Sequence, residues 1–388
     1  MELKELQQHI RTLSTLEETS SQVISCYLNL EDGTAAYRNA LDERAGMLRK
    51  TFSGEERKDF EEALGRIEDF LSAGLRPGTK GVAIFSRAGA QPFFLPLQFR
   101  VPLPNWIVAG STPNIYHLVE LKDTYDRYLV LISTEESARI IEVNLGEVTE
   151  EIWKERPELR KRVGREWSKE HYQNHRRSRT DQFIKEKIQL LEQLMAAGGH
   201  THLLLAGNPR ITARVRDALP KHLTAKLVDT IVASGSDRLS DVVAATLSAF
   251  VEQEELESQG VVERLMQEIH RHALGVAGLD ATIQTLRQGN LDVLVLASAF
   301  DPEMGWSCAA CGALGVNRGR LDVCPECGQH ELQEIDLREE MVRLAERLGC
   351  SVEIVNHSDS LMQFGGVGAL LRYYAPEQFY QRGRQSHD

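Results

Sequence analysis

The sequence Phe364-Gly365-Gly366-Val367-Gly368-Ala369-Leu370-Leu371-Arg372-Tyr373 closes an α/β pattern that occupies the last third of the chain. Upstream of it, apolar runs at 293–297 and 351–355 predict two strands, and the amphipathic stretch 336–348 predicts a helix between them. Asp336 and Glu339 have the spacing of a capping box, with Asp in place of Ser or Thr. This order of elements predicts an α/β layer.

Two pairs of cysteines lie between the first of these strands and the helix. Their spacing is C-x2-C-x12-C-x2-C, and the residues are Cys308, Cys311, Cys324 and Cys327. A two-residue gap lets both thiolates of a tight turn face one tetrahedral ion, and the glycine after each pair can take the positive φ that closes the turn. Four thiolates leave no open coordination position, so the spacing predicts one structural zinc per chain. Two disulfides, or four unrelated cysteines, are the alternatives.

The composition is that of an ordinary globular chain of two or three cores. The chain has 388 residues, of which 26% are charged and 42% hydrophobic. No apolar run approaches the roughly 20 residues that span a bilayer, and the N-terminus has no signal-peptide core. Cys26 and Cys350 are expected to be lone buried thiols, which indicates a reducing compartment and predicts a cytoplasmic protein. The net charge of −12 means that any contact with nucleic acid must be local.

The middle of the chain predicts a second α/β layer. Two strands come first, and the later strands alternate with helices, in the order 128–133, 138–143, 180–195, 201–206, 211–218, 227–232 and 240–257. A basic block lies across the start of the first helix: residues 154–187 contain twelve Lys or Arg against six acidic residues. Aromatic and histidine side chains are interleaved with it. Arginine with aromatic rings is a chemistry that binds unstacked RNA, whereas most charge runs are solvated helix faces.

The first third predicts a separate domain. The order is a helix at 2–16, a strand at 23–30, two helices at 36–50 and 55–73, and two strands at 82–86 and 92–101. Pro102, Pro104 and Pro113 mark a linker after them. Gly78, Lys80 and Gly81 lack the spacing of a phosphate-binding loop and are interpreted as a turn.

In this order the elements resemble the archaeal and eukaryotic class-1 peptide release factors and Pelota. In that family the C-terminal α/β domain carries a Cys-x-x-Cys ribbon in some members and ends in a strand similar to 365–373. The resemblance implies three α/β domains in a release-factor/Pelota-like arrangement. The N-terminal domain, 1–118, is decoding-domain-like, and the middle domain, 119–259, carries the basic loop. The C-terminal domain, 260–376, carries the zinc ribbon, and a flexible tail, 377–388, follows it.

Two functional motifs of that family are missing. The family carries Gly-Gly-Gln in an exposed loop before a long helix that is entered through an aromatic residue and several arginines. The helix entry is present here, but Arg165-Glu166-Trp167 stands where the tripeptide is expected. The Asn-Ile-Lys-Ser loop that reads stop codons in the family is also absent, because the hinge between the two N-terminal helices is Thr51-Phe52-Ser53-Gly54.

The resemblance therefore implies a non-hydrolytic translation factor of the Balon type, a bacterial member without Gly-Gly-Gln. We expect it to bind rRNA in the ribosomal A site during rescue or hibernation, with a translational GTPase as a further partner and no membrane or DNA partner. The RNA-binding residues expected are Arg165, Trp167, Lys169, His171, Tyr172, His175, Arg176, Arg177 and Arg179. His171 and His175, four residues apart, could share a metal, but the sequence offers no third ligand.

Two other functions stay open. A peptidyl-tRNA hydrolase, or chain release factor, could position water with Glu166, His171 or Gln173. A stress-related RNA-binding scaffold could have kept the fold and left the ribosome. The missing tripeptide favours the translation factor over the hydrolase, and the retained basic, aromatic loop favours it over the scaffold.

Overall fold

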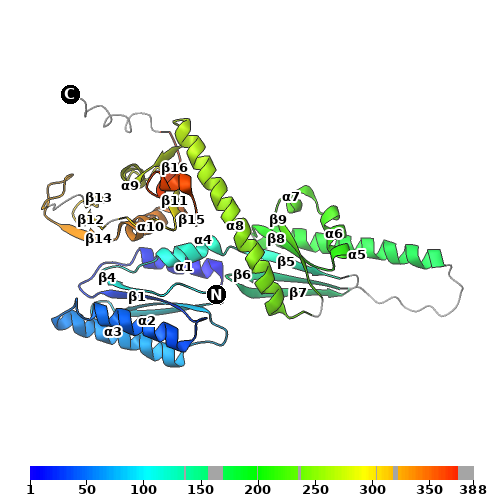
Figure 1. Cartoon of the computed structure of the whole chain (residues 1–388), viewed down its shortest axis with the longest axis horizontal. Coiled ribbons are helices and arrows are strands. Elements are labelled where there is room, and N and C mark those ends of the chain that lie inside the picture. The colour runs from blue at the N-terminus through cyan, green and yellow to red at the C-terminus, as the bar shows by residue number, and fades with distance from the viewer. Residues whose placement is uncertain are drawn as a thin grey trace. The chain divides into compact units, whose positions relative to one another are not determined.

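The computed structural model of the chain describes residues 1–134, 137–155, 169–198, 200–234, 237–302, 304–317 and 322–374 (Figure 1). Side chains are described for the same ranges except 152–177 and 198. The chain forms two compact units. The middle unit comprises Met1–Leu3 and Tyr125–Gln253, and the terminal unit comprises Lys4–Thr124 and the residues from Glu254 onward.

The middle unit is a sheet with helices on both faces. Its strand order is β7-β6-β5-β8-β9, and the strands are β5 (Tyr128–Ser133), β6 (Ser137–Asn144), β7 (Glu147–Glu155), β8 (His202–Gly207) and β9 (Leu227–Val232). The pairs β5–β8 and β8–β9 are parallel, and β5–β6 and β6–β7 are antiparallel. The helices are α5 (Lys169–Gly198), α6 (Pro209–Ala218), α7 (Lys221–Thr224) and the first part of α8 (Leu239–His270).

Alternation along the central strand builds the two layers of this core. On β5, Leu129 and Leu131 pack with the apolar residues of α5 and α6, while Tyr128, Val130 and Ile132 pack with those of α8. The expected strands and helices are therefore present. Strand β7 was not predicted from the sequence, and α5 begins at Lys169 rather than at residue 180.

The N-terminal part of the terminal unit is an antiparallel sheet of order β3-β2-β1-β4. Its strands are β1 (Val23–Asn29), β2 (Gly81–Arg87), β3 (Phe93–Phe99) and β4 (Trp106–Gly110). Helices α2 (Thr34–Leu48) and α3 (Gly54–Ala73) share one apolar cluster with this sheet, and α1 (Leu3–Ser14) and α4 (Tyr116–Thr124) lie on its other side in Figure 1. The proline-marked stretch expected to be a linker therefore includes an edge strand, β4, paired with β1.

The C-terminal part of the terminal unit is a sheet of order β10-β16-β11-β15. The strands are β10 (Gly275–Ala277), β11 (Leu291–Ala297), β15 (Ser351–Val355) and β16 (Val367–Leu371), and the helices are α9 (Leu279–Arg287), α10 (Leu337–Leu348) and α11 (Asp359–Met362). The glycine-rich ending is thus the strand β16, paired antiparallel with β10 and β11. A Cβ on Gly368 would lie 2.8 Å from the side chain of Leu265, so glycine lets α8 approach the sheet.

Only half of the predicted capping box forms at α10. The side chain of Asp336 accepts a hydrogen bond from the N–H of Glu339 (3.1 Å), as expected. Glu339 does not return the bond. Its two carboxylate oxygens instead accept the backbone N–H groups of Ile115 (2.7 Å) and Tyr116 (3.0 Å), so a buried side chain of α10 caps helix α4.

The terminal unit therefore joins residues from both ends of the chain. Lys122 pairs with Glu346, and Asp123 Oδ2 accepts the N–H of Ile354 (2.7 Å), so α4 is held along its length by α10 and β15. The α/β class with several sheets is confirmed. The boundaries of the three domains stay a prediction, and the tail 377–388 lies outside the described residues.

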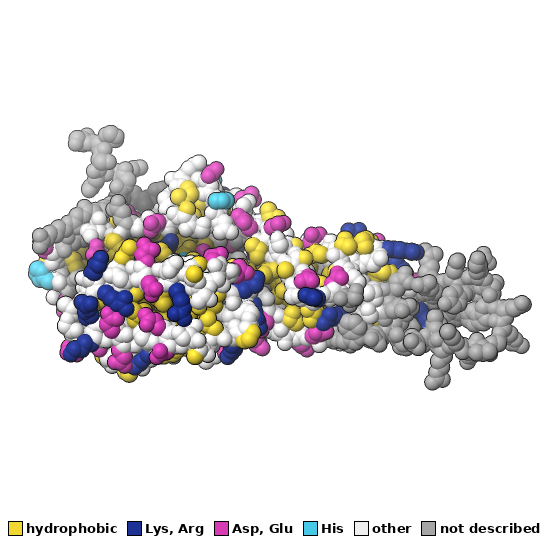
Figure 2. All heavy atoms as spheres, turned by 60° about the horizontal axis from the view of Figure 1, so that its bottom comes forward, with side chains coloured by type: hydrophobic (Ala, Val, Ile, Leu, Met, Phe, Trp, Pro, Cys, Tyr) yellow, Lys and Arg dark blue, Asp and Glu magenta, His cyan; other side chains and the backbone are white. Residues whose placement is uncertain are grey.

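Among the described helices none is both long and apolar enough to cross a membrane. The face drawn in Figure 2 carries basic and acidic side chains intermingled over the described residues.

Candidate metal centre and basic segment

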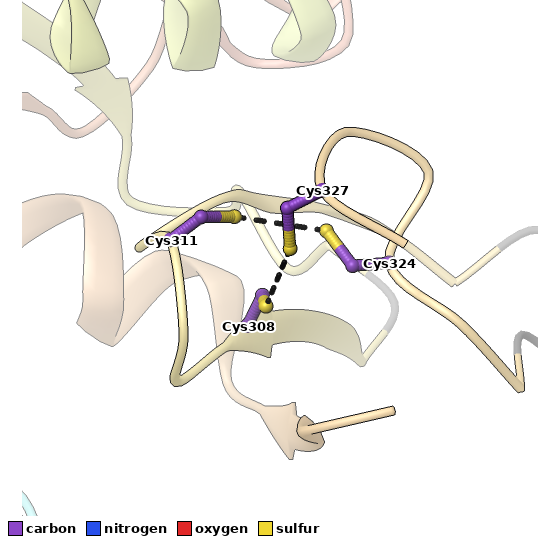
Figure 3. Close-up of side chains that lie close together, drawn as sticks. All are labelled: Cys308, Cys311, Cys324 and Cys327. Carbon is purple, nitrogen blue, oxygen red and sulfur yellow. Dashed lines mark hydrogen bonds between the residues drawn. The ribbon is translucent and has the colours of Figure 1, made fainter. Parts of the chain in front are cut away.

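The four predicted cysteines converge on one point. They are carried by a small sheet of order β13-β12-β14, made of β12 (Gly305–Cys308), β13 (Leu314–Val316) and β14 (Leu332–Ile335). The Sγ atoms of Cys308 and Cys327 are 3.6 Å apart, those of Cys311 and Cys324 are 3.7 Å apart, and all four lie within 4.8 Å of one another (Figure 3).

These spacings suit a metal and exclude a disulfide. Tetrahedral zinc with bonds of about 2.3 Å holds its sulfurs about 3.8 Å apart, whereas a disulfide needs about 2.05 Å. All four cysteines are free thiols. The structure therefore contradicts the disulfide alternative and brings together four sulfurs that could hold one metal ion.

Both cysteine pairs form the same turn. The N–H of Gly312 donates to the carbonyl of Cys308 (2.8 Å), and the N–H of Gly328 donates to that of Cys324 (2.9 Å). The two glycines have φ of +70° and +73°, as the sequence predicted. Each turn is closed by a bond from the N–H of its first cysteine, to Ala313 O in one case and to Gln329 O in the other.

The electrostatics of the cluster favour a cation. Burial raises the pKa of Cys324, but hydrogen bonds from the backbone N–H groups of Cys327 and Glu326 lower it to about 7. A hydrogen bond from the N–H of Gln329 lowers the pKa of Cys327, yet burial and the neighbouring cysteines raise it to about 12. Four adjacent thiols cannot all ionise without a compensating positive charge, and a bound dication supplies one. The donor set therefore fits zinc.

Two contacts hold the ribbon on the α/β layer. Arg287 of α9 forms a two-pronged ion pair with Glu326, with one distance of 2.6 Å, and this hydrogen bonding raises the pKa of Arg287 and lowers that of Glu326. Gly305 of β12 packs against α10: a Cβ there would clash with the side chain of Leu337 and lie 2.7 Å from Gly315 O. The second cysteine turn is therefore held by α9, and strand β12 is held separately by α10.

The basic segment is only partly within the described residues. Arg165 and Trp167 lie outside them, so their RNA contact stays a prediction. Six further predicted residues lie on the backbone of α5, and their side chains are not described: Lys169, His171, Tyr172, His175, Arg176 and Arg177. Arg179 is partly exposed. A metal shared by His171 and His175 is likewise untested.

The topology shows where the chain leaves the sheet at the start of this segment. Strand β7 ends at Glu155, which pairs with Ser137, the first residue of β6. Ser137 follows the end of β5, and β5 and β8 are parallel, so they finish at the same end of the sheet. The chain therefore leaves the sheet at the carboxyl ends of β5 and β8.

Two charged side chains of α5, Lys187 and Asp181, have partners on other elements that the helical periodicity of the sequence could not predict. Lys187 is buried, and its Nζ donates to Ser133 Oγ (2.6 Å) and Thr134 O (2.9 Å) at the end of β5. Asp181 forms an ion pair with Arg214 of α6 (2.5 Å). The sequence did not predict the role of Arg214, because α6 is recognised only by the spacing of its apolar residues.

Comparison with known proteins finds related translation factors. The model of the family "Bacterial archaeo-eukaryotic release factor family 10" matches residues 113–251. The chain is 24% identical to the peptide chain release factor subunit 1 of Thermococcus onnurineus, covering 96% of this chain and 98% of that protein. It is 23% identical to that of Thermococcus kodakarensis with the same coverage. The crystal structure of Archaeoglobus fulgidus Pelota has 15% identity and a TM-score of 0.39, covering 96% of this chain and 92% of that one.

Proposed function

We propose, from the membership of this chain in the release factor/Pelota superfamily, that it is a ribosome-associated translation factor which does not hydrolyse peptidyl-tRNA. It would occupy the A site during ribosome rescue or hibernation. The similarity to peptide chain release factors over nearly their whole length supports a translation role, and the family match lies over the middle unit.

The absence of Gly-Gly-Gln carries the non-hydrolytic part of the proposal. The sequence contains no such tripeptide, and Arg165-Glu166-Trp167 occupies the expected position. Glycine lets a backbone approach the tRNA terminus closely because it has no Cβ. Two long charged side chains and an indole would block that approach, whereas the indole can stack on a base of rRNA.

RNA contact by the basic segment is the second part. The nine predicted residues, from Arg165 to Arg179, combine guanidinium groups with aromatic and imidazole rings. The chain leaves the sheet at the carboxyl ends of β5 and β8 shortly before this segment, which supports RNA contact at that end of the middle unit. A solvated helix face would need no interleaved aromatic rings.

Zinc is the third part. We assign one structural zinc to Cys308, Cys311, Cys324 and Cys327, supported by sulfur spacings of 3.6 and 3.7 Å and by two matching cysteine turns. With four thiolate ligands the ion has no free position, so it would hold the ribbon together without contacting substrate.

Sedimentation tests the ribosome association. The purified protein would be centrifuged with vacant, translating and stationary-phase ribosomes, with and without a translational GTPase and GTP. The proposal expects co-sedimentation with at least one ribosome population, and competition by a tRNA bound in the A site. Protein that stays in the supernatant with every population would contradict the proposal and favour the RNA-binding scaffold.

Peptide release is the competing function, and the names of the relatives favour it. It would require a group other than glutamine to position water, and Glu166, His171 and Gln173 are the candidates. A release assay separates the two functions, because only the hydrolase frees the peptide.

A further inference from the structure

A second group of arginines lies beside α5, on helix α6. Helices α5 and α6 pack on the same face of the middle-unit sheet, through Phe183, Ile184 and Ile188 of α5 and Ile211 and Val215 of α6. The ion pair between Asp181 and Arg214 shows that the two helices lie side by side at this level. Helix α6 starts at Pro209, two residues after the end of β8 at Gly207, at the end of the sheet from which the predicted basic segment departs.

The arginines of α6 divide between two sides of the helix. Ile211, Thr212 and Val215 are buried against the sheet, so they define its inner side. Arg214 is on the flank that faces α5, and Arg210, one turn earlier, is on the same side. Arg216 is on the opposite flank and lies 3.7 Å from the neighbouring Asp217.

Arg210 is available for an external ligand. It is exposed, and no side-chain hydrogen bond or ion pair connects its guanidinium to another residue described in the structure. The start of α6 is held in place beneath it, because the backbone N–H of Arg210 donates to the side chain of Asn208 (2.9 Å). Side-chain exposure of Arg214 is 31%, so its guanidinium is reachable from solvent although it touches Asp181.

The level of Arg210 matches the basic part of α5. Both helices run away from the carboxyl end of the sheet, since each is followed by a strand of the parallel set. One turn before Asp181 on α5 is position 177, within the arginine-rich stretch 176–179. Arg210 and Arg214 therefore lie at the same end of the middle unit as the backbone of residues 176–179 on α5.

We propose that Arg210 and Arg214 bind phosphate groups of the RNA that the basic segment of α5 contacts. This rests on the proposed ribosome association and adds a second row to its footprint. A guanidinium presents parallel N–H donors that match a phosphate, and two of them one turn apart can hold consecutive positions of an RNA backbone. These contacts position the protein and carry no base specificity.

The competing explanation is that Arg214 only joins α5 to α6 through Asp181. The variant Asp181→Asn separates the two. It removes the ion pair but leaves both arginines, and it takes one negative charge away from the surface. Phosphate binding predicts equal or tighter RNA binding by Asp181→Asn, and a purely structural pair predicts weaker binding, as for Arg214→Gln.

The experiment measures binding at several salt concentrations for wild type, Arg210→Gln/Arg214→Gln, Arg216→Gln and Asp181→Asn. Two targets are used in parallel, ribosomes and a short RNA hairpin. The double variant should weaken binding about tenfold or more near physiological salt and reduce the salt slope by about 2, because each phosphate that an arginine neutralises adds about 1 to the slope. Arg216→Gln, which removes one positive charge from the other flank of α6, should leave the slope unchanged, and half of the double variant's effect is the value expected if only charge mattered.

The use of two targets distinguishes failure of the proposed function from failure of the phosphate-binding proposal. If wild type binds the hairpin with the expected variant pattern but never binds ribosomes, the proposed function fails and the phosphate row stands. If wild type binds ribosomes and the double variant behaves like Arg216→Gln on both targets, the phosphate row is wrong. Weaker binding by Asp181→Asn would also overturn it. Circular dichroism of each variant confirms that the helices are intact.

Discussion

At the scale of residues, the metal centre depends on a few side chains with defined neighbours. The spacing of the cysteines predicted their convergence because a two-residue gap constrains a turn locally. The second turn is anchored by the ion pair between Arg287 and Glu326. These residues are almost forty positions apart, so no local sequence pattern predicted the pair.

Replacing one ligand should release the metal. We expect Cys324→Ser to lower the zinc content from about one equivalent to below half, and to lower Tm, because three thiolates hold the ion less tightly than four. Elemental analysis and thermal unfolding measure both. Cys350→Ser is the control, since Cys350 is a buried thiol that donates to Leu291 O outside the cluster, and its zinc content should be unchanged. Full metal content in Cys324→Ser would rule out this ligand set.

Glu339 should make stability depend on pH. Burial raises its pKa from 4.5 to about 8, against the opposing hydrogen bonds from Ile115 and Tyr116. The folded protein thus keeps a proton that the unfolded chain loses, so the contribution of Glu339 to stability falls as pH rises from about 4.5 to 8. Glu339→Ala leaves two buried N–H groups without an acceptor and should cost about 1–3 kcal/mol.

That cost should be larger at pH 5 than at pH 8, because the contribution of the carboxyl group declines over this range. Urea unfolding of wild type and Glu339→Ala at both pH values measures it, with the exposed Glu334→Ala as control. An equal cost at the two pH values would contradict the raised pKa.

At the scale of elements, alternation and helical periodicity predicted most strands and helices of the α/β layers, because each buries one face. Strand β7 was not predicted because its sequence, Glu147 to Glu155, is rich in charged residues and forms a sheet edge. Strand β4 was not predicted because prolines stand on both sides of it in the sequence.

The packing of the ribbon on α10 should tolerate no extra methyl group. Gly305→Ala would place a Cβ against Leu337 and should destabilise the protein by roughly 1–3 kcal/mol. Gly260→Ala is the matched control, because Gly260 lies within α8 with no atom within 4 Å of an added Cβ. It should stabilise by about 0.5–1 kcal/mol, since alanine favours helix. Denaturant unfolding of both variants checks the opposite signs, and stabilisation by both would show that the ribbon is not packed there.

Charge reversal at the basic segment should weaken ribosome binding. Arg176→Glu, Arg177→Glu and Arg179→Glu together should reduce the salt slope by about 1 for each phosphate that is no longer neutralised. Reversal of Glu252, Glu254 and Glu255 on α8 should change binding little. Binding isotherms at increasing salt distinguish the two sets, and equal effects would mean that the basic block is an ordinary solvated face.

At the scale of the whole molecule, the order of elements was enough to predict several α/β layers, but not which parts of the chain form one unit. The association of residues 4–124 with residues from 254 onward depends on contacts such as Asp123 with Ile354, more than two hundred positions apart. Such pairs leave no periodicity in the sequence. The proposed function follows from the similarity to peptide chain release factors and from the missing tripeptide.

The central claim is A-site occupancy without hydrolysis, and single-turnover release of labelled formyl-methionine from ribosome–peptidyl-tRNA complexes tests it most directly. With this chain alone, release should stay at the no-factor background, with or without a stop codon in the A site. Added before a competent release factor, the chain should slow release by that factor. Release well above background by the chain alone, abolished by Glu166→Ala or Gln173→Ala, would contradict the claim and identify a hydrolase.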